Sequence, residues 1–264
     1  MNNHLARLAV EVNWRHLALG HETFDVPGAT FVRNRAFPII YDANFVFGIA
    51  ASDAEEIERL LSRAALEYAH ASRLTFRVDP FTPPAFEARL LLEGYERGEV
   101  LVLLLERDLP DPTRPLDIRP VGNEAGWQAY AALKRLDSLE HSVRTKDDAL
   151  SQAVADGLIS SNRIKCPPVQ YLLAYENEEA VGFCSAWEGP QGVGQVEDLF
   201  VRPSSRHRGI ATALICSAVA TARARGAGPM VIVADAADTP KTMYAALGFQ
   251  PVAVCRQYGR RVKR

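Results

Sequence analysis

The sequence predicts an α/β protein of the α+β kind, in which a mixed, twisted sheet is flanked by helices and the chain is divided into two units. Two observations lead to this fold class. From residue 116 onward, short β-prone runs alternate with helical patterns, and a long helix connects two of the strands. The stretch 108–115 is rich in Pro and Asp, and its prolines lack the backbone donors that a strand or helix requires. We therefore expect an N-terminal unit over residues 1–112 and a C-terminal unit over residues 113–264.

The C-terminal unit is expected to contain a regular series of elements. They are a strand at 116–120, helices at 124–136 and 146–158, strands at 169–175, 180–187 and 194–201, a helix at 211–225, a strand at 230–234, a helix at 240–247 and a strand at 251–257. Asn177-Glu178 predicts a tight hairpin turn. Gly226 suits the end of one helix and Pro240 the first turn of another. The basic stretch Arg256–Arg264 is expected to be a solvated tail.

The N-terminal unit ends in a pattern that the C-terminal unit repeats. Residues 91–103 and 246–254 both predict the end of a helix, a Gly-aromatic pair and a strand, and an apolar strand with a turn precedes each of them. This favours an internal duplication. In the N-terminal unit, Tyr41-Asp42-Ala43-Asn44 is expected to be a structural turn, with a place in an acceptor cleft as the alternative.

Composition excludes several classes of protein. Of the 264 residues, 48% are hydrophobic and 23% charged, and the formal net charge is -2, so no nucleic-acid partner is expected. The longest apolar run, Val100–Leu105, is too short to cross a membrane, and the N-terminus shows no secretory signal. Cys166, Cys184, Cys216 and Cys255 are scattered in apolar segments, which favours buried, reduced thiols in a cytoplasmic protein. His16 and His21 have no matching ligand pattern, so no metal site is expected.

The segment 196–214 carries the chemistry. A β-prone strand runs into a short loop with Arg206, Arg208 and Gly209, and the loop runs directly into a helix. A helix N-terminus presents unpaired N–H groups and a partial positive charge, which attract phosphate. Gly209 and Ala211 allow a pyrophosphate to approach the backbone, and the two arginines add charge. The patterns of P-loop, Rossmann and serine hydrolase sites do not occur.

The spacing of this segment resembles the signature of the GNAT superfamily of acetyl-CoA-dependent N-acyltransferases. The residues Val201-x-Pro203-x-x-Arg206-x-x-Gly209-Ile210-Ala211-x-x-Leu214 fill its specified positions. A second signature of that family follows as the strand 231–235 and the run Tyr244-x-x-x-Gly248-Phe249. The resemblance covers residues 116–257 and implies a GNAT-like sheet in the C-terminal unit. Because the N-terminal unit lacks the Arg-x-x-Gly-x-Ala loop, it resembles a degenerate GNAT-like copy without a cofactor site.

The resemblance implies a site for acetyl-CoA. The thioester substrate would lie in a V-shaped opening between the strand that ends at Val201 and the strand at 230–234. The implied contacts come from the backbone of Leu199, Phe200 and Val201 for the pantetheine arm, from Arg206, His207, Arg208, Gly209, Ile210 and Ala211 for the pyrophosphate, and from Thr212. The family often has Asn seven residues before the tyrosine. Here that residue is Ala237, and Thr239 or Lys241 is expected to replace the contact.

Two residues are implied in catalysis. Glu197 lies where the family often places its general base, and its neighbour Asp198 is the alternative, because strand alternation lets only one of the two face the cleft. Tyr244 matches the tyrosine that protonates the departing thiolate. A backbone N–H near Leu199 would meet the oxyanion.

The expected activity is direct transfer of an acetyl group to a primary amine of a small molecule or peptide, with acetyl-CoA as co-substrate and no metal. A non-catalytic acyl-CoA sensor or interaction module is one alternative, and an acyltransferase with a different acyl-CoA is another. The loops at 140–145 and 160–168 are expected on the acceptor side. The oligomeric state stays open.

Overall fold

The computed structural model describes residues 3–109, 115–145, 152–237 and 240–262. The chain forms two compact units. Unit 1 comprises Met1–Val102, Ala234–Lys241 and Pro251–Arg264, and unit 2 comprises Leu103–Val233 and Thr242–Gln250. The final strand of the chain therefore belongs to unit 1. The expected boundary near residue 112 stays a prediction, since residues 110–114 lie outside the described ranges.

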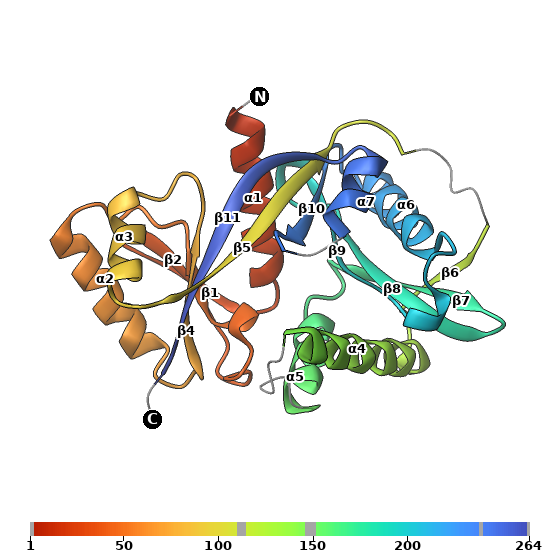
Figure 1. Ribbon diagram of the computed structural model, residues 1–264, viewed down its shortest axis with the longest axis horizontal. Helices are drawn as coiled ribbons and strands as arrows, with labels where there is room; N and C mark the ends of the chain where they lie inside the picture. The colour runs from red at the N-terminus through yellow and green to blue at the C-terminus, as the bar shows by residue number, and fades with distance from the viewer. Residues whose placement is uncertain (1–2, 110–114, 146–151, 238–239, 263–264) are drawn as a thin grey trace. The chain divides into compact units, whose positions relative to one another are not determined.

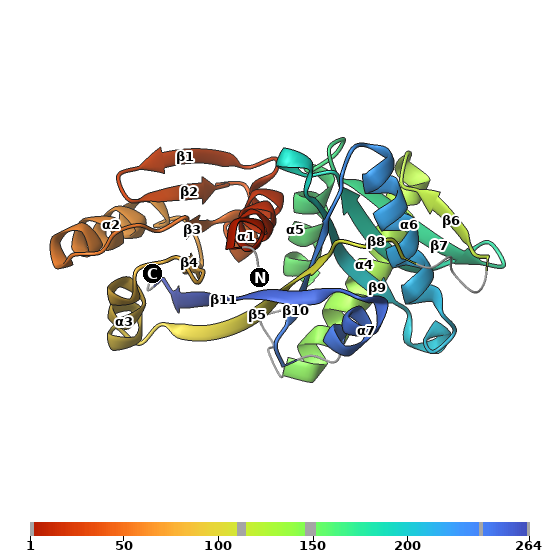
Figure 2. The ribbon, with the colours of Figure 1, turned by 90° about the horizontal axis from the view of Figure 1, so that it is seen from above.

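Unit 1 is a mixed sheet with helices on both faces (Figure 1). Its elements are α1 (Asn3–Ala18), β1 (Glu22–Val26), β2 (Ala29–Arg33), η1 (Tyr41–Ala43), β3 (Phe45–Phe47), α2 (Ala54–Glu67), β4 (Arg73–Val78), α3 (Pro84–Leu92), β5 (Glu96–Leu105) and β11 (Gln250–Arg261). The strand order is β1-β2-β3-β4-β11-β5, which can be followed in Figure 2. Alternation along the strands separates the faces: Phe31 packs in the core under α2 and α3, whereas its neighbour Val32 packs with Ala18 of α1.

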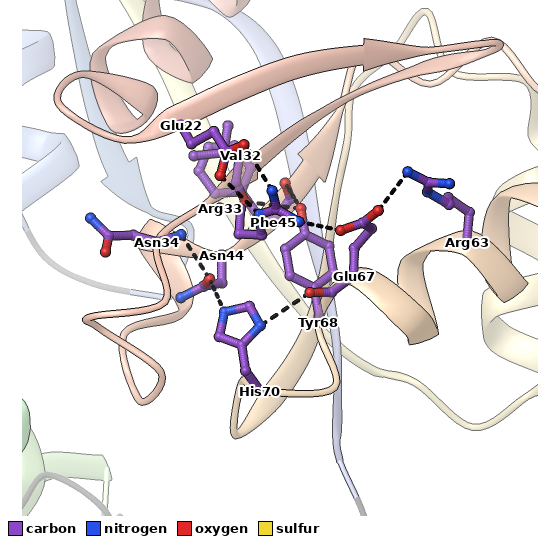
Figure 3. Close-up of polar contacts among 10 residues, drawn as sticks. All are labelled: Glu22, Val32, Arg33, Asn34, Asn44, Phe45, Arg63, Glu67, Tyr68 and His70. Atoms are coloured by element: carbon purple, nitrogen blue, oxygen red, sulfur yellow. Dashed lines mark hydrogen bonds and ion pairs between the residues drawn. The ribbon is translucent and has the colours of Figure 1, made fainter.

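A polar cluster connects the end of α2 to β2 and β3 in unit 1 (Figure 3). The hydroxyl of Tyr68, at the end of α2, lies 2.6 Å from the carbonyl oxygen of Phe45 and 2.9 Å from that of Val32. His70 lies with Nε2 3.0 Å from Oδ1 of the fully buried Asn44, whose amide also binds the backbone of its own loop. The segment 41–44 is thus a structural turn, as expected. Its buried polar groups are satisfied inside unit 1.

Unit 2 contains the other strands of the mixed sheet, with helices on both faces. Its elements are β6 (Asp117–Pro120), α4 (Glu124–Thr145), α5 (Gln152–Arg163), β7 (Gln170–Glu176), β8 (Glu179–Trp187), η2 (Pro190–Gly192), β9 (Gly194–Val201), η3 (Pro203–Ser205), α6 (Ile210–Ala224), β10 (Met230–Asp235) and α7 (Pro240–Leu247). The strand order is β10-β9-β8-β7-β6, antiparallel except for the parallel pair β9–β10 that α6 connects. The rings of Tyr130 from α4 and Phe183 from β8 pack at 4.8 Å on one face. Leu214 of α6 packs over Gly182 on the other.

Most expected elements are confirmed, and the differences lie at element ends. The hairpin turn Asn177-Glu178 has φ of 49° and 63°, the left-handed pair that a two-residue hairpin favours. The helix expected at 124–136 continues to Thr145, although Leu139 and Val143 in this continuation are exposed. The helix expected to begin at residue 146 is described only from Gln152.

The helices α3 and α7, one in each unit, end with the same backbone geometry, which supports the expected duplication. In α3, the N–H of Tyr95 binds the carbonyl of Leu90, and Gly94 has a φ of 72°. In α7, the N–H of Phe249 binds the carbonyl of Tyr244, and Gly248 has a φ of 100°. Both helices thus end in the same Gly-terminated Schellman arrangement, followed by a buried aromatic residue and a strand.

The expectation of a solvated basic tail is wrong. The residues from Arg256 to Arg261 pair with β4 as an antiparallel strand inside unit 1. Cys255 and Tyr258 are fully buried, and the hydroxyl of Tyr258 donates a 2.7 Å hydrogen bond to Glu87. Two basic side chains on this strand form ion pairs: Arg256 with Glu87 and Glu99, and Arg260 with Glu93 at the end of α3. The strand expected at 251–257 thus continues to Arg261, and the high charge concealed this continuation because Arg256 and Arg260 are paired with carboxylates.

Tyr258→Phe tests whether this strand contributes to the stability of the fold. The substitution keeps the ring and removes the hydrogen bond to Glu87, so we expect a loss of about 1–2 kcal/mol in the free energy of unfolding. Urea unfolding followed by circular dichroism measures it. Val254→Ala, at a side chain that is 38% exposed, is the control and should change stability by less than about 0.5 kcal/mol. Equal stability of the Tyr258→Phe variant and the native protein would contradict the assignment.

The remaining expectations about composition can be compared with the fold. All four cysteines are free, three of them are buried and Cys166 is half-buried. Within the described ranges, no helix is both long and apolar enough to cross a bilayer. In the same part of the chain, no cluster of His, Cys, Asp and Glu side chains is suited to hold a metal ion.

Candidate functional site

Strands β9 and β10 pair only near their beginnings and then part. Their parallel ladder, within the described residues, consists of Gly194, Gln195 and Val196 paired with residues 230–232. From Glu197 to Val201, β9 continues as a strand along β8 without a partner on the β10 side in this register. The backbone groups of Leu199, Phe200 and Val201 therefore lie on a strand edge that is free to pair with an extended ligand.

The opening coincides with a bulge in β9. Phe183 of β8 pairs with Phe200, and Ser185 pairs with Glu197, so Asp198 and Leu199 together lie opposite a single residue of β8. Asp198 has a φ of 60°, a left-handed conformation that Asp adopts more readily than most residues. The hydroxyl of Ser185 donates a 3.1 Å hydrogen bond to the carbonyl of Glu197. The bulge is thus satisfied on the β8 side and bends the strand where the two strands part.

The loop after β9 leads directly into the N-terminus of α6. Gly209 is the N-cap of α6, has a φ of 79°, and makes no capping hydrogen bond through a side chain. A Cβ placed on Gly209 would meet no atom within 4 Å, so the space beside it is open. Ile210 is buried and anchors the first turn, whereas Ala211 and Thr212 are half-buried. The first-turn amides therefore face an accessible region without a capping carboxylate or hydroxyl on the N-cap residue.

The two arginines of the loop make other contacts than expected. The guanidinium of Arg206 donates to the carbonyl of Val201 at 2.9 Å and to both oxygens of Glu140 at 2.6 and 2.8 Å. Arg208 lies 2.8 Å from a carboxylate oxygen of Glu176. Arg206 thus braces the end of β9 against α4. His207 is exposed and adopts a φ of 60°, which turns the chain into Gly209.

Glu197 is a half-buried carboxyl with an elevated proton affinity. Burial raises the pKa of Glu197 to about 7, and the negative charge of Asp198 adds to this increase. The amide of Gln195 donates a 2.8 Å hydrogen bond to it, and the ammonium of Lys165 acts in the same direction, so both oppose the rise. A carboxyl with a pKa near neutrality can take and release protons under ordinary conditions.

Asp198 has the opposite electrostatic character. Tyr130, Lys134 and Asn162 donate to its carboxylate at 2.5, 2.6 and 3.0 Å. Burial alone would raise the pKa of Asp198, but the ammonium of Lys134 and these hydrogen bonds hold that pKa below its usual value. The carboxylate is ionised and fully engaged. Of the two adjacent carboxyls, only Glu197 has a raised pKa. Sequence reasoning gave no role to Tyr130, Lys134 or Asn162.

Tyr244 lies in the last turns of α7 and is buried, with its ring centroid 6.3 Å from that of Phe249. Both residues belong to unit 2, as do Glu197 and α6. The ammonium of Lys241 donates to the carbonyl of Ala236. The expected contact from Thr239 lies outside the described residues.

The corresponding helix of unit 1 has a different N-terminus. Strands β3 and β4 form a parallel pair that α2 connects, as α6 connects β9 and β10. However, the N-cap of α2 is Asp53, whose carboxylate accepts a 2.8 Å hydrogen bond from the N–H of Glu56. The carboxylate of Glu56 accepts in return from the N–H of Ser52 at 2.9 Å. This arrangement, similar to a capping box, places two negative charges at the start of α2, where they oppose the binding of a phosphate.

Comparison with known families identifies the second half of the chain. Residues 133–249 match the acetyltransferase (GNAT) family. They form a GNAT domain. The match includes β9, its bulge, the loop and α6, and it ends at Phe249 after the Gly-terminated helix α7. The family is one of acyltransferases. No curated protein matches the chain significantly.

Solved structures extend this result from the GNAT domain to the fold of the whole chain. A GCN5-related N-acetyltransferase from Kribbella flavida is similar with a TM-score of 0.68 and 18% identity, over 98% of this chain and 96% of that one. A conserved protein of unknown function from Staphylococcus epidermidis has the same TM-score with 14% identity, over 92% and 95% of the two chains. A tandem GNAT protein from the clavulanic acid biosynthesis pathway has a TM-score of 0.59 and 13% identity, over 90% and 80%. Unit 1 is accordingly a second, GNAT-like half.

Proposed function

We propose that this protein is an N-acetyltransferase that transfers the acetyl group of acetyl-CoA to a primary amine of a small molecule or peptide. The observation that carries the proposal is the parting of β9 and β10 beside a carboxyl with a near-neutral pKa, immediately before an uncapped helix start. A strand edge, a proton acceptor and a phosphate-attracting terminus occur in this order within a short segment of one domain.

The residues of unit 2 fit the parts of an acyl-CoA. The open edge of Leu199, Phe200 and Val201 suits the amide-containing pantetheine arm, which can pair with it as a short strand. The first-turn amides of α6, next to Gly209, suit the pyrophosphate. The guanidinium groups of Arg206 and Arg208 already have carboxylate partners, so the backbone supplies most of the recognition. Because α2 is capped by Asp53, we expect one acyl-CoA per chain.

Glu197 is the proposed general base. When bound, acyl-CoA supplies a thioester carbon at which the C–N bond to the amine forms as the C–S bond breaks. An alkyl amine with a pKa of about 10 is mostly protonated near neutrality and must lose a proton before it can attack. Glu197 accepts that proton, directly or through water, because its pKa near 7 leaves a substantial fraction ionised at neutral pH. The N–H near Leu199, in the bulge, is the proposed hydrogen-bond donor to the oxyanion.

Tyr244 is the proposed acid that gives a proton to the departing sulfur. Tyr244→Phe removes the phenol hydroxyl and keeps the buried ring. Because the ring continues to pack, the variant should fold. A thiolate with a pKa of about 8.5 leaves without full protonation, so we expect kcat to fall by only about tenfold, with KM for acetyl-CoA unchanged. Steady-state thiol release measures both constants. A native kcat in the Tyr244→Phe variant would remove Tyr244 from the mechanism.

The activity itself is tested by thiol release from acetyl-CoA with a panel of small and peptide amines, repeated with longer acyl-CoA thioesters. Turnover with acetyl-CoA and at least one amine supports the proposal. Faster turnover with a longer thioester would favour an acyltransferase of different donor specificity. Binding of CoA without turnover on any amine would favour a sensor, the remaining alternative. Absence of both binding and turnover would refute the assignment of the site.

A further inference from the structure

A buried ionic cluster lies behind the bulge of β9, on the side of α4 and α5. Lys134 donates from Nζ to Asp198 at 2.6 Å and to Asp137 at 2.9 Å. Tyr130 and Asn162 donate to the second oxygen of Asp198 at 2.5 and 3.0 Å. The side chains of Lys134 and Asp198 are only 11% and 13% exposed. Both members of this ion pair are thus buried, and the acyl-transfer chemistry described above does not use it.

Asp198 is the residue that makes the bulge, so its side-chain contacts act on the backbone. Its left-handed φ is unfavourable for most residues, and it persists only if surrounding contacts compensate. Three hydrogen-bond donors from α4 and α5 hold the carboxylate of Asp198, so its backbone has little freedom to adopt a regular strand conformation. A regular strand would continue the ladder with β10 beyond Val196 and close the opening.

Glu197 is influenced by charged neighbours, and one of them, Asp198, belongs to this cluster. On its own strand Glu197 adjoins Asp198, and from the turn after α5 it is influenced by Lys165. On α4, across Asp198, lie Lys134, Asp137 and Tyr130, and on β8 lies the thiol of Cys184. The ionised Asp198 raises the pKa of Glu197, and Lys134 keeps Asp198 ionised.

We propose that Tyr130, Lys134 and Asn162 are positioning residues that act through Asp198 to hold the bulge of β9, and thereby set both the width of the acyl-CoA opening and the charge environment of Glu197. The inference rests on the proposed function. The pH dependence of turnover distinguishes this role from a purely stabilising one. If the ion pair of Lys134 and Asp198 only stabilised the fold, its removal would leave that pH dependence unchanged.

The test compares full-length variants with acetyl-CoA and an amine that the native protein accepts. Asp198→Asn keeps the shape and the tolerance for a left-handed backbone and removes the charge that raises the pKa of Glu197. We therefore expect the acid limb of the kcat/KM profile to move to lower pH. Lys134→Met and Tyr130→Phe loosen the bulge, and misplacement of the reacting groups should lower kcat by between about tenfold and a hundredfold. Arg135→Gln, at an exposed ion pair on the same helix, is the control and should change neither constant.

The outcomes separate this inference from the proposed function. If the native protein turns over but Asp198→Asn has a native pH profile and Tyr130→Phe has kcat and KM within a factor of about two of native, the inference is overturned. Tyr130→Phe retains the packed ring, so it decides the question even if Lys134→Met does not fold. If the native protein turns over no amine, the proposed function fails by itself. CoA titrated calorimetrically into Tyr130→Phe then decides: weakened binding supports the positioning role, and unchanged binding refutes it.

Discussion

Glu197→Gln is expected to lower kcat/KM by about 10²–10⁴-fold, the range that a general base contributes. The amide retains the size and the hydrogen-bonding capacity of the carboxyl but cannot take a proton from the incoming ammonium. In the native protein the carboxyl has a pKa of about 7, so it is protonated and inactive below that pH and ionised above it. Activity should thus rise with pH, with an acid limb centred near pH 7. In the Glu197→Gln variant this limb should disappear.

Thiol release across a pH series measures the effect, with circular dichroism as a check on folding. Glu179→Gln is a matched control, because Glu179 lies on the neighbouring strand β8 in an exposed ion pair with Arg202. It should leave both the rate and the profile unchanged. Native turnover with an intact acid limb in the Glu197→Gln variant would show that another group accepts the proton.

The local parts of the site could be predicted from the sequence. The positions of Pro203 and Gly209 between a strand and a helix could be predicted from their spacing, because a helix that begins at a glycine after a strand has a short-range sequence pattern. The structure also confirms the expected bounds of β9 and α7. The reversal of chain direction at Gly248 is equally local, since it needs only a left-handed residue at a helix end.

The contacts between distant segments could not be predicted in this way. Asp198 and Lys134 meet only because α4 packs against β8 and β9, and no periodicity in the sequence specifies that pair. Likewise, the sequence led us to expect Arg206 at a phosphate. Its ion pair with Glu140 could not be predicted, because that contact depends on how α4 packs in the fold. The continuation of the final strand beyond residue 257 was missed, because carboxylates of unit 1 pair with Arg256 and Arg260. Sequence patterns thus predicted the local backbone features, such as strand ends and helix ends, whereas the side-chain contacts between distant segments could be identified only in the structure.

Gly209→Ala is expected to weaken CoA binding by about ten- to a hundredfold. The added methyl group would stand in open space, so it meets no protein atom, but that space is where a pyrophosphate must approach the first-turn amides of α6. A φ of 79° is also unfavourable for Ala, and relaxation would turn the amides away. Each charge-assisted hydrogen bond lost costs about 1.5–3 kcal/mol, and about 1.4 kcal/mol corresponds to a factor of ten. Isothermal titration of CoA measures the affinity.

Gly226→Ala is the matched control at the opposite end of the same helix. Gly226 has a φ of 105°, and a Cβ there would likewise meet nothing within 4 Å. Both substitutions should therefore cost a similar amount of folding stability, about 1–2 kcal/mol, measured by urea unfolding. Only the Gly209→Ala variant should lose CoA affinity, because only the N-terminus of α6 carries the unpaired amides and the positive end of the helix dipole. Equal affinities in the two variants would mean that the phosphate groups bind elsewhere on the GNAT domain.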